Sequence, residues 1–190
     1  PYSPKAGTGL SSHELNQPGC YRDVSDTTIT AQFKVKDFSP KAKMELGSPE
    51  GAVYILAWTT TPWTLPSNTA LAVSKEIDYV LVRTFNQYTF EPIQVVLAKE
   101  LVAKQFAGKF FETSKEADFV AYANDENRKK VPYEVLAECK GADLVGTTYE
   151  QLIPWFLPAE NAEKAFRVIP GDFVTTEDGT GIVHIAPTFG

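Results

Sequence analysis

The sequence predicts a mainly β domain, with a closed or partly closed barrel at its centre and a few peripheral helices. Three observations support this fold class. Many short apolar or alternating runs have the length of strands, turn residues separate them, and only a few segments have helical periodicity. The chain has 190 residues, of which 43% are hydrophobic and 22% charged, which is ordinary for one globular domain with a single core.

The first four expected strands lie in residues 27–85. Residues 27–36 alternate between apolar and polar side chains, which is typical of a half-buried strand. Residues 52–58 form a continuous apolar run and predict a strand that is buried on both faces. Residues 69–73 and 78–85 predict two more strands.

The later segments mix strands with short helical pieces. Residues 94–107 begin as a strand and continue as a short helix, since Leu97, Leu101, Val102 and Phe106 share one helical face. Residues 133–153 carry apolar pieces around a glycine turn. Residues 166–174 and 181–187 predict strands on either side of a tight turn at Asp178-Gly179.

The domain organisation follows from composition. Residues 1–24 are rich in Ser, Gly and Pro and predict an arm or linker, and residues 25–190 predict the folded domain. The chain begins without Met and has no hydrophobic signal region, so we interpret it as part of a larger protein.

Charge and composition exclude several function classes. Eighteen basic against 24 acidic residues give a net charge of −6, which argues against a domain that grips a long nucleic acid by its phosphates. Contact with one end of a nucleic acid stays compatible with this charge. Cys20 and Cys139 have no CxxC spacing, and His13 and His184 are the only histidines, so a metal site has little support. No apolar run approaches the roughly 20 residues that span a bilayer.

The segment Trp58–Asn68, WTTTPWTLPSN, is the first candidate site. Its simplest interpretation is a strand end with hydroxyls in water. However, neighbouring side chains on a strand point to opposite faces, so three adjacent threonines cannot all face solvent. Pro62 and Pro66 stiffen the loop, and Asn68 adds an amide that both donates and accepts hydrogen bonds. The segment predicts a polar cradle on a rigid frame.

His184 is the second candidate. It lies in GTGIVHIAPTFG, and alternation places it on the same face as Ile182 and Ala186. A single histidine among apolar residues is usually a hydrogen-bonded core residue, and the residues alone leave that interpretation open.

Together, the two segments resemble a known family. WTTTPWTLPSNTALAV and DGTGIVHIAPTFG closely resemble the editing domain (connective polypeptide insertion) of isoleucyl-tRNA synthetase, a class I enzyme. PYSPKAGTGLSSHEL resembles the stretch just before that insertion, so the resemblance spans nearly the whole chain. The valyl and leucyl enzymes carry Thr-Thr-Arg-Pro, whereas here Pro62 follows the threonines directly, as in the isoleucyl type.

The resemblance implies the barrel-centred editing-domain fold of the valyl, isoleucyl and leucyl synthetases and a hydrolytic activity. A pocket for isoleucine cannot strongly exclude valine, and this pair is the standard example of that limit. The implied remedy is a second site that admits valine, excludes isoleucine and hydrolyses the ester of valyl-tRNA(Ile), with valyl-adenylate as a second candidate substrate. The implied parent enzyme attaches isoleucine to tRNA(Ile).

The resemblance also implies roles for individual residues. Thr60, Thr61 and Asn68 are the implied catalytic residues, and Thr59, Thr64, His184 and Trp58 the implied substrate-binding residues. The threonines would hold the terminal adenosine and the ester, Asn68 would fix the reacting geometry, and His184 would block isoleucine's extra methyl group. In the family pattern, an Asp a few residues beyond Pro-Thr-Phe-Gly binds the substrate's ammonium group, and that position follows Gly190.

We expect an oriented water to attack the ester, with no covalent intermediate, no metal and no cofactor for editing. ATP would serve only the parent's synthetic site, outside this chain. The expected partners are the 3′ end of tRNA(Ile) carrying valine and the catalytic domain of the parent, in a cytoplasmic monomer with no membrane contact. Two alternatives stay open: an editing domain of valyl or leucyl type, and a non-catalytic barrel that docks tRNA.

Overall fold

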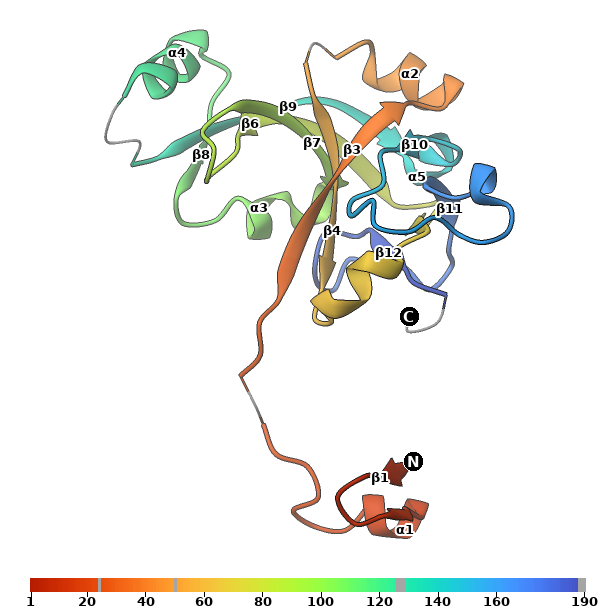
Figure 1. The fold of residues 1–190 in the computed structure, drawn as a ribbon. Helices are drawn as coiled ribbons and strands as arrows, with labels where there is room; N and C mark the ends of the chain where they lie inside the picture. Colours follow the sequence, from red (N-terminus) through yellow and green to blue (C-terminus); the bar gives the residue numbers. More distant parts are fainter. Residues whose placement is uncertain (24, 50, 126–128, 188–190) are drawn as a thin grey trace.

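The computed structural model describes residues 1–190 except 24, 50, 126–128 and 188–190. One large mixed sheet dominates it (Figure 1). Among the described residues this sheet has ten strands, which confirms the mainly β prediction. In chain order they are β3 (Ile29–Asp37), β4 (Val53–Thr59), β5 (Ala70–Val73), β6 (Asp78–Phe85), β7 (Pro92–Ala98), β8 (Phe110–Glu112), β9 (Val131–Lys140), β10 (Thr148–Tyr149), β11 (Arg167–Pro170) and β12 (Val183–Ile185).

The strand order is β12-β5-β11-β10-β3-β4-β7-β6-β9-β8. Most neighbours are antiparallel, and the pairs β4–β7, β5–β11 and β8–β9 are parallel. In the described part of the chain, β12 and β8 stand at opposite ends of this order, so the pairings do not close the sheet into a barrel. The two strands on either side of the Asp178-Gly179 turn do not pair with each other, because β5 lies between β11 and β12.

Short helices lie around the sheet, as predicted. The longest, α4, has nine residues, and no helix in the described ranges is long and apolar enough to cross a membrane. The helical piece expected after β7 is present as η2 and α3, although Leu97 itself lies in β7. The helices are α1 (Ser12–Leu15), α2 (Pro40–Leu46), η1 (Pro62–Ser67), η2 (Lys99–Leu101), α3 (Val102–Gln105), α4 (Glu116–Asn124), α5 (Gly141–Leu144) and η3 (Ala162–Lys164).

Both faces of the central strands are buried, which explains their continuous apolar sequences. Along β6, Tyr79 and Leu81 belong to one core cluster, while Val80 and Val82 belong to a second. The same alternation divides β4 and β7 between the two clusters. Burial on both faces fixes the register of each strand, since a slip of one residue exchanges the two sets of side chains.

The first residues form a separate small unit. Among the described strands, β1 (Tyr2–Ser3) and β2 (Thr8–Gly9) pair only with each other, and α1 has no buried residue. Figure 1 shows this unit away from the ten-stranded sheet. The boundary between residues 24 and 25 stays a prediction, because residue 24 lies outside the described ranges.

We predict that Gly141→Ala strongly destabilises the domain. A Cβ at this position would lie 1.9 Å from the Ser74 carbonyl oxygen and 2.8 Å from Tyr79 Cε2. Backbone and a buried ring cannot both move away without cost, so the free energy of unfolding should fall by about 1–3 kcal/mol or more. Urea unfolding measures this change.

Gly9→Ala is the matched control, because its Cβ would meet only the Pro1 carbonyl oxygen at 3.9 Å. Equal unfolding midpoints for the two variants would contradict the close packing of α5 against the β5–β6 connection.

Candidate functional site

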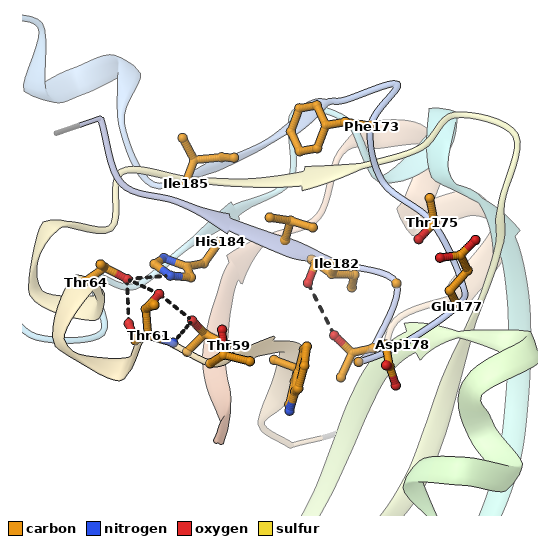
Figure 2. Close-up of a pocket in the computed structure, with 16 residues that line it drawn as sticks. Thr59, Thr61, Thr64, Phe173, Thr175, Glu177, Asp178, Ile182, His184 and Ile185 are labelled. Carbon is orange, nitrogen blue, oxygen red and sulfur yellow. Dashed lines mark hydrogen bonds between the residues drawn. The ribbon is translucent and has the colours of Figure 1, made fainter. Parts of the chain in front are cut away.

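A cavity of about 750 Å³ lies where the end of β4, η1, β12 and the loop before β12 meet. Figure 2 shows the side chains around it. Six of the seven site residues predicted from sequence line this cavity, although they come from segments more than 100 residues apart. The lining consists of Trp58, Thr59, Thr60, Thr61, Thr64, Phe173, Thr175, Glu177, Asp178, Gly179, Thr180, Gly181, Ile182, Val183, His184 and Ile185.

The three adjacent threonines differ in exposure, as strand alternation requires. Thr59 ends β4 and is buried, Thr60 is exposed, and Thr61 is half-buried. The Thr59 hydroxyl accepts a hydrogen bond from the Thr61 backbone N–H at 3.0 Å and lies 3.2 Å from the Thr61 hydroxyl. These contacts turn the chain at the strand end, and η1 then begins at Pro62, whose ring suits the first helical position.

Thr64 connects the threonine segment to His184. Its hydroxyl donates to the Thr61 carbonyl oxygen at 2.7 Å and lies 2.9 Å from His184 Nε2. Because the hydroxyl proton is used on Thr61, the oxygen of Thr64 accepts from His184, which places the imidazole proton on Nε2. One side-chain hydrogen bond therefore joins the two candidate segments of the sequence.

His184 is held in its neutral form. The side chain is buried together with Ile182 and Ala186, which confirms the shared face predicted by alternation. Within the described residues its Nδ1 is buried and has no hydrogen-bond partner. Burial lowers the pKa of the imidazole below its ordinary value, since the charged form would lose its hydration.

Two glycines let the loop before β12 pack closely against the strands. Gly179 and Gly181 have φ values of +72° and +70°, in the region that favours glycine. A Cβ on Gly179 would lie 3.0 Å from Trp58 Cε3, and one on Gly181 would lie 2.4 Å from Ala98 Cβ. Because both positions lack a side chain, the loop can pack directly against Trp58 and Ala98 at the cavity wall.

Polar contacts to the segment after β7 hold this loop in place. The Thr176 hydroxyl donates to Glu100 at 2.5 Å, and the Gln105 amide donates to the Gly179 carbonyl oxygen at 2.7 Å. Asp178 pairs with Lys104, and this partner lowers the pKa of its carboxyl group. The anchored loop is the rim of the cavity opposite the threonines.

Asn68 is the one predicted site residue that does not line the cavity. It is only 4% exposed. Its side-chain N–H donates to the Ala70 carbonyl oxygen at 2.9 Å, and its oxygen accepts from the Tyr149 hydroxyl at 2.7 Å. Burial raises the pKa of Tyr149, so this phenol stays a donor. The structure thus uses the amide to fix the turn between η1 and β5.

The structure also shows cavity residues that the sequence analysis missed. Phe173, Thr175 and Glu177 line the rim, whereas Trp63 is exposed and lies outside the lining. The strand predicted over residues 166–174 ends at Pro170, because Asp172 and Phe173 form a turn, and Thr175 and Glu177 follow in a loop without a periodic pattern.

The chemistry of the lining favours neutral hydrogen bonding. Thr59, Thr61 and Thr64 supply hydroxyls, and the pKa of His184 is lowered, while the carboxylates of Glu177 and Asp178 lie on the loop before β12. In the described ranges, no group of three or more His, Cys, Asp and Glu side chains is placed to hold a metal ion. The absence of a metal requirement stays a prediction.

Comparison with known sequences identifies the family. The chain is 63% identical over its whole length to the isoleucine--tRNA ligase of Bacteroides thetaiotaomicron and 60% identical to that of Porphyromonas gingivalis. The chain belongs to the isoleucine--tRNA ligase family. It spans 16% of the length of each of these two relatives. No family model matches the chain.

Solved structures confirm the fold. The structure described as GlLeuRS-CP1 has a TM-score of 0.55 at 18% identity, covering 85% of this chain and 55% of its own. The editing domain of the P. knowlesi cytosolic leucyl-tRNA synthetase has a TM-score of 0.54 at 14% identity, covering 83% and 56%. The match to isoleucine--tRNA ligase and the editing-domain fold confirm the resemblance seen in the two motifs.

We predict that His184 makes stability depend on pH below neutrality. The folded pKa is lowered, so on acidification the unfolded chain takes up a proton at His184 before the native state does. The free energy of unfolding should therefore fall as pH decreases below about 6.5, the ordinary histidine pKa.

Urea unfolding from pH 7 to pH 5 measures this fall, and His184→Gln should make it shallower. His13→Gln, in an exposed position on α1, is the matched control. Identical pH slopes for the wild type and His184→Gln would contradict a neutral, buried imidazole.

Proposed function

We propose that this chain is the editing site of an isoleucyl-tRNA synthetase and hydrolyses the ester of valyl-tRNA(Ile). The observation that carries the proposal is the hydrogen-bonded chain Thr59–Thr61–Thr64–His184 along one cavity wall. The identity to isoleucine--tRNA ligases and the editing-domain fold support this assignment. The parent enzyme would attach isoleucine to tRNA(Ile) with ATP at a site outside this chain.

His184 is the proposed size filter. Thr64 fixes one ring nitrogen, and Ile182 and Ala186 are buried on the same face, so the ring has little freedom to move. A rigid wall can reject an added methyl group because a well-packed site cannot expand without cost. We propose that the side chain of valine fits beside this ring and that isoleucine does not.

The proposed reaction needs no nucleophilic side chain. An aminoacyl ester is already activated, and the cavity is lined by hydroxyl-bearing residues that can orient a water and stabilise the oxyanion. Thr60 is exposed and Thr61 half-buried, so we propose that these two contact the reacting ester. Asn68 would act as a positioning residue, because it holds the turn after η1 and is buried outside the lining.

Entry of a tRNA end agrees with the acidic composition. Only the terminal nucleotides would reach the cavity, so the domain needs no broad basic face. We propose the 3′ end of tRNA(Ile) and the parent's catalytic domain as partners, in a cytoplasmic monomer. An editing domain of valyl or leucyl type is the alternative, since the solved neighbours are leucyl domains whose likeness concerns the fold. A non-catalytic module that docks tRNA is the other.

The test is deacylation of valyl-tRNA(Ile) and isoleucyl-tRNA(Ile) by the full-length synthetase that contains this chain. We expect hydrolysis of the valyl form only. Thr61→Val should lower the rate constant about 10²–10³-fold, the usual effect of losing one oxyanion donor. Thr89→Val is the control, because Thr89 is exposed and outside the cavity.

Four outcomes would contradict the proposal. Absence of valyl-tRNA hydrolysis by a ligase that still charges isoleucine favours the docking module. Preferential hydrolysis of threonyl-tRNA favours the valyl type. Activity that is lost to a chelator and restored by zinc, or a trapped acyl-enzyme, excludes direct attack by water without a metal.

We further predict that His184→Ala weakens discrimination between valine and isoleucine. Removal of the ring leaves space for one more methyl group, so the ratio of valyl to isoleucyl hydrolysis should fall at least tenfold, within the range that one methylene provides. The measurement is the ratio of the two deacylation rate constants.

His13→Ala changes an exposed histidine away from the cavity and should leave that ratio as in the wild type. If His184→Ala slows both substrates equally, the ring supports the site without acting as a size filter.

A further inference from the structure

The cavity contacts both faces of β12. His184 and the threonines lie on one side of this strand, whereas Phe173 and Ile185 lie on the other (Figure 2). Alternation places Val183 on the same side as Ile185. One side of the strand is therefore hydroxyl-rich, and the other carries three apolar side chains.

The edge position of β12 lets one ligand reach both sides. Among the described strands, β12 pairs with β5 alone and ends the strand order, so its second edge is unpaired. Five consecutive residues of this segment, 181–185, line the same continuous cavity. A ligand with two parts can lie across the edge, with one part on each face.

Phe173 presents a flat ring at the apolar side. Phe173 lines the cavity, but its side chain is still 64% exposed. A Cβ on Gly171 would lie 2.9 Å from Phe173 Cε1 and 3.0 Å from Cζ, so the ring rests against the bare backbone of this glycine. Gly171 is itself buried and donates its N–H to the Val73 carbonyl oxygen at 2.9 Å.

The turn that carries the ring is well anchored. Val174 is buried, and its N–H donates to the Gly171 carbonyl oxygen at 3.2 Å. The ring is thus supported from behind by a glycine and fixed on both sides by buried backbone. A supported and exposed aromatic ring is the kind of surface on which a nucleobase stacks, since every base has a flat π face.

We propose that Phe173 stacks on the base of the terminal nucleotide, on the face of β12 opposite to the threonines and His184. This inference rests on the proposed function, because the base belongs to the same aminoacylated tRNA end whose ester the site would hydrolyse. The acyl group lies against His184, the ribose crosses the unpaired edge of β12, and the base lies on Phe173 with Val183 and Ile185 beside it. The threonines then hold the ester, and Phe173, on the opposite face of β12, contacts the base.

The experiment measures kcat/KM for deacylation of valyl-tRNA(Ile) by the full-length synthetase and by variants at position 173. Phe173→Ala should lower kcat/KM about tenfold, within the range found when one stacked base loses its aromatic partner. Phe173→Leu keeps apolar bulk without a flat ring and should be equally impaired. Phe173→Tyr and Phe173→Trp keep a flat ring and should restore kcat/KM.

Phe156→Ala is the matched control, because Phe156 is 80% exposed and does not line the cavity. It should deacylate like the wild type, and all variants should charge isoleucine normally. Wild-type values for Phe173→Ala and Phe173→Leu, with active wild-type enzyme, overturn the stacking role alone. Full activity of Phe173→Leu with loss in Phe173→Ala shows simple apolar packing and also overturns it. A wild-type enzyme without deacylation overturns the proposed function itself.

Discussion

The hydrogen bond between the Thr64 hydroxyl and His184 Nε2 connects residues 120 positions apart and determines the character of the cavity. The Thr64 hydroxyl donates its proton to the Thr61 carbonyl oxygen, so the Thr64 oxygen accepts the hydrogen bond from His184. The imidazole then carries its proton on Nε2, and burial separately lowers its pKa. This contact fixes the imidazole against the threonine segment, whose hydroxyls are also held by the Thr59–Thr61 and Thr64–Thr61 hydrogen bonds.

Strand β5 is what brings the two partners of that contact together. It lies between β11 and β12, parallel to the first and antiparallel to the second, and it begins directly after the Asn68 turn. Asn68 fixes this turn by bonding to Ala70 and Tyr149. The Asn68 amide therefore supports the site indirectly, because it fixes the start of β5, the strand that pairs with β12. Its role in the motif is to position the backbone.

The sequence could predict features that depend on local pattern. Alternation and apolar runs located β3, β4, β5 and β6, and alternation placed His184 on a buried face with Ile182 and Ala186. The resemblance selected six residues that the structure brings to one cavity. Helix α2 was missed, because its signal is a Ser39 cap before Pro40 and not an apolar periodicity. The open strand order was also beyond reach, since pairing partners depend on contacts between distant segments.

By itself, the sequence determined the mainly β character, the rigid threonine segment and the family. Each follows from side-chain period, proline placement or a long motif, all of which are local along the chain. Only the tertiary structure decided that Asn68 faces away from the cavity, that Phe173 and Glu177 line its rim, and that β12 has an unpaired edge. These features depend on how separate strands pack, because the direction of a side chain in a turn is fixed by its neighbours in space.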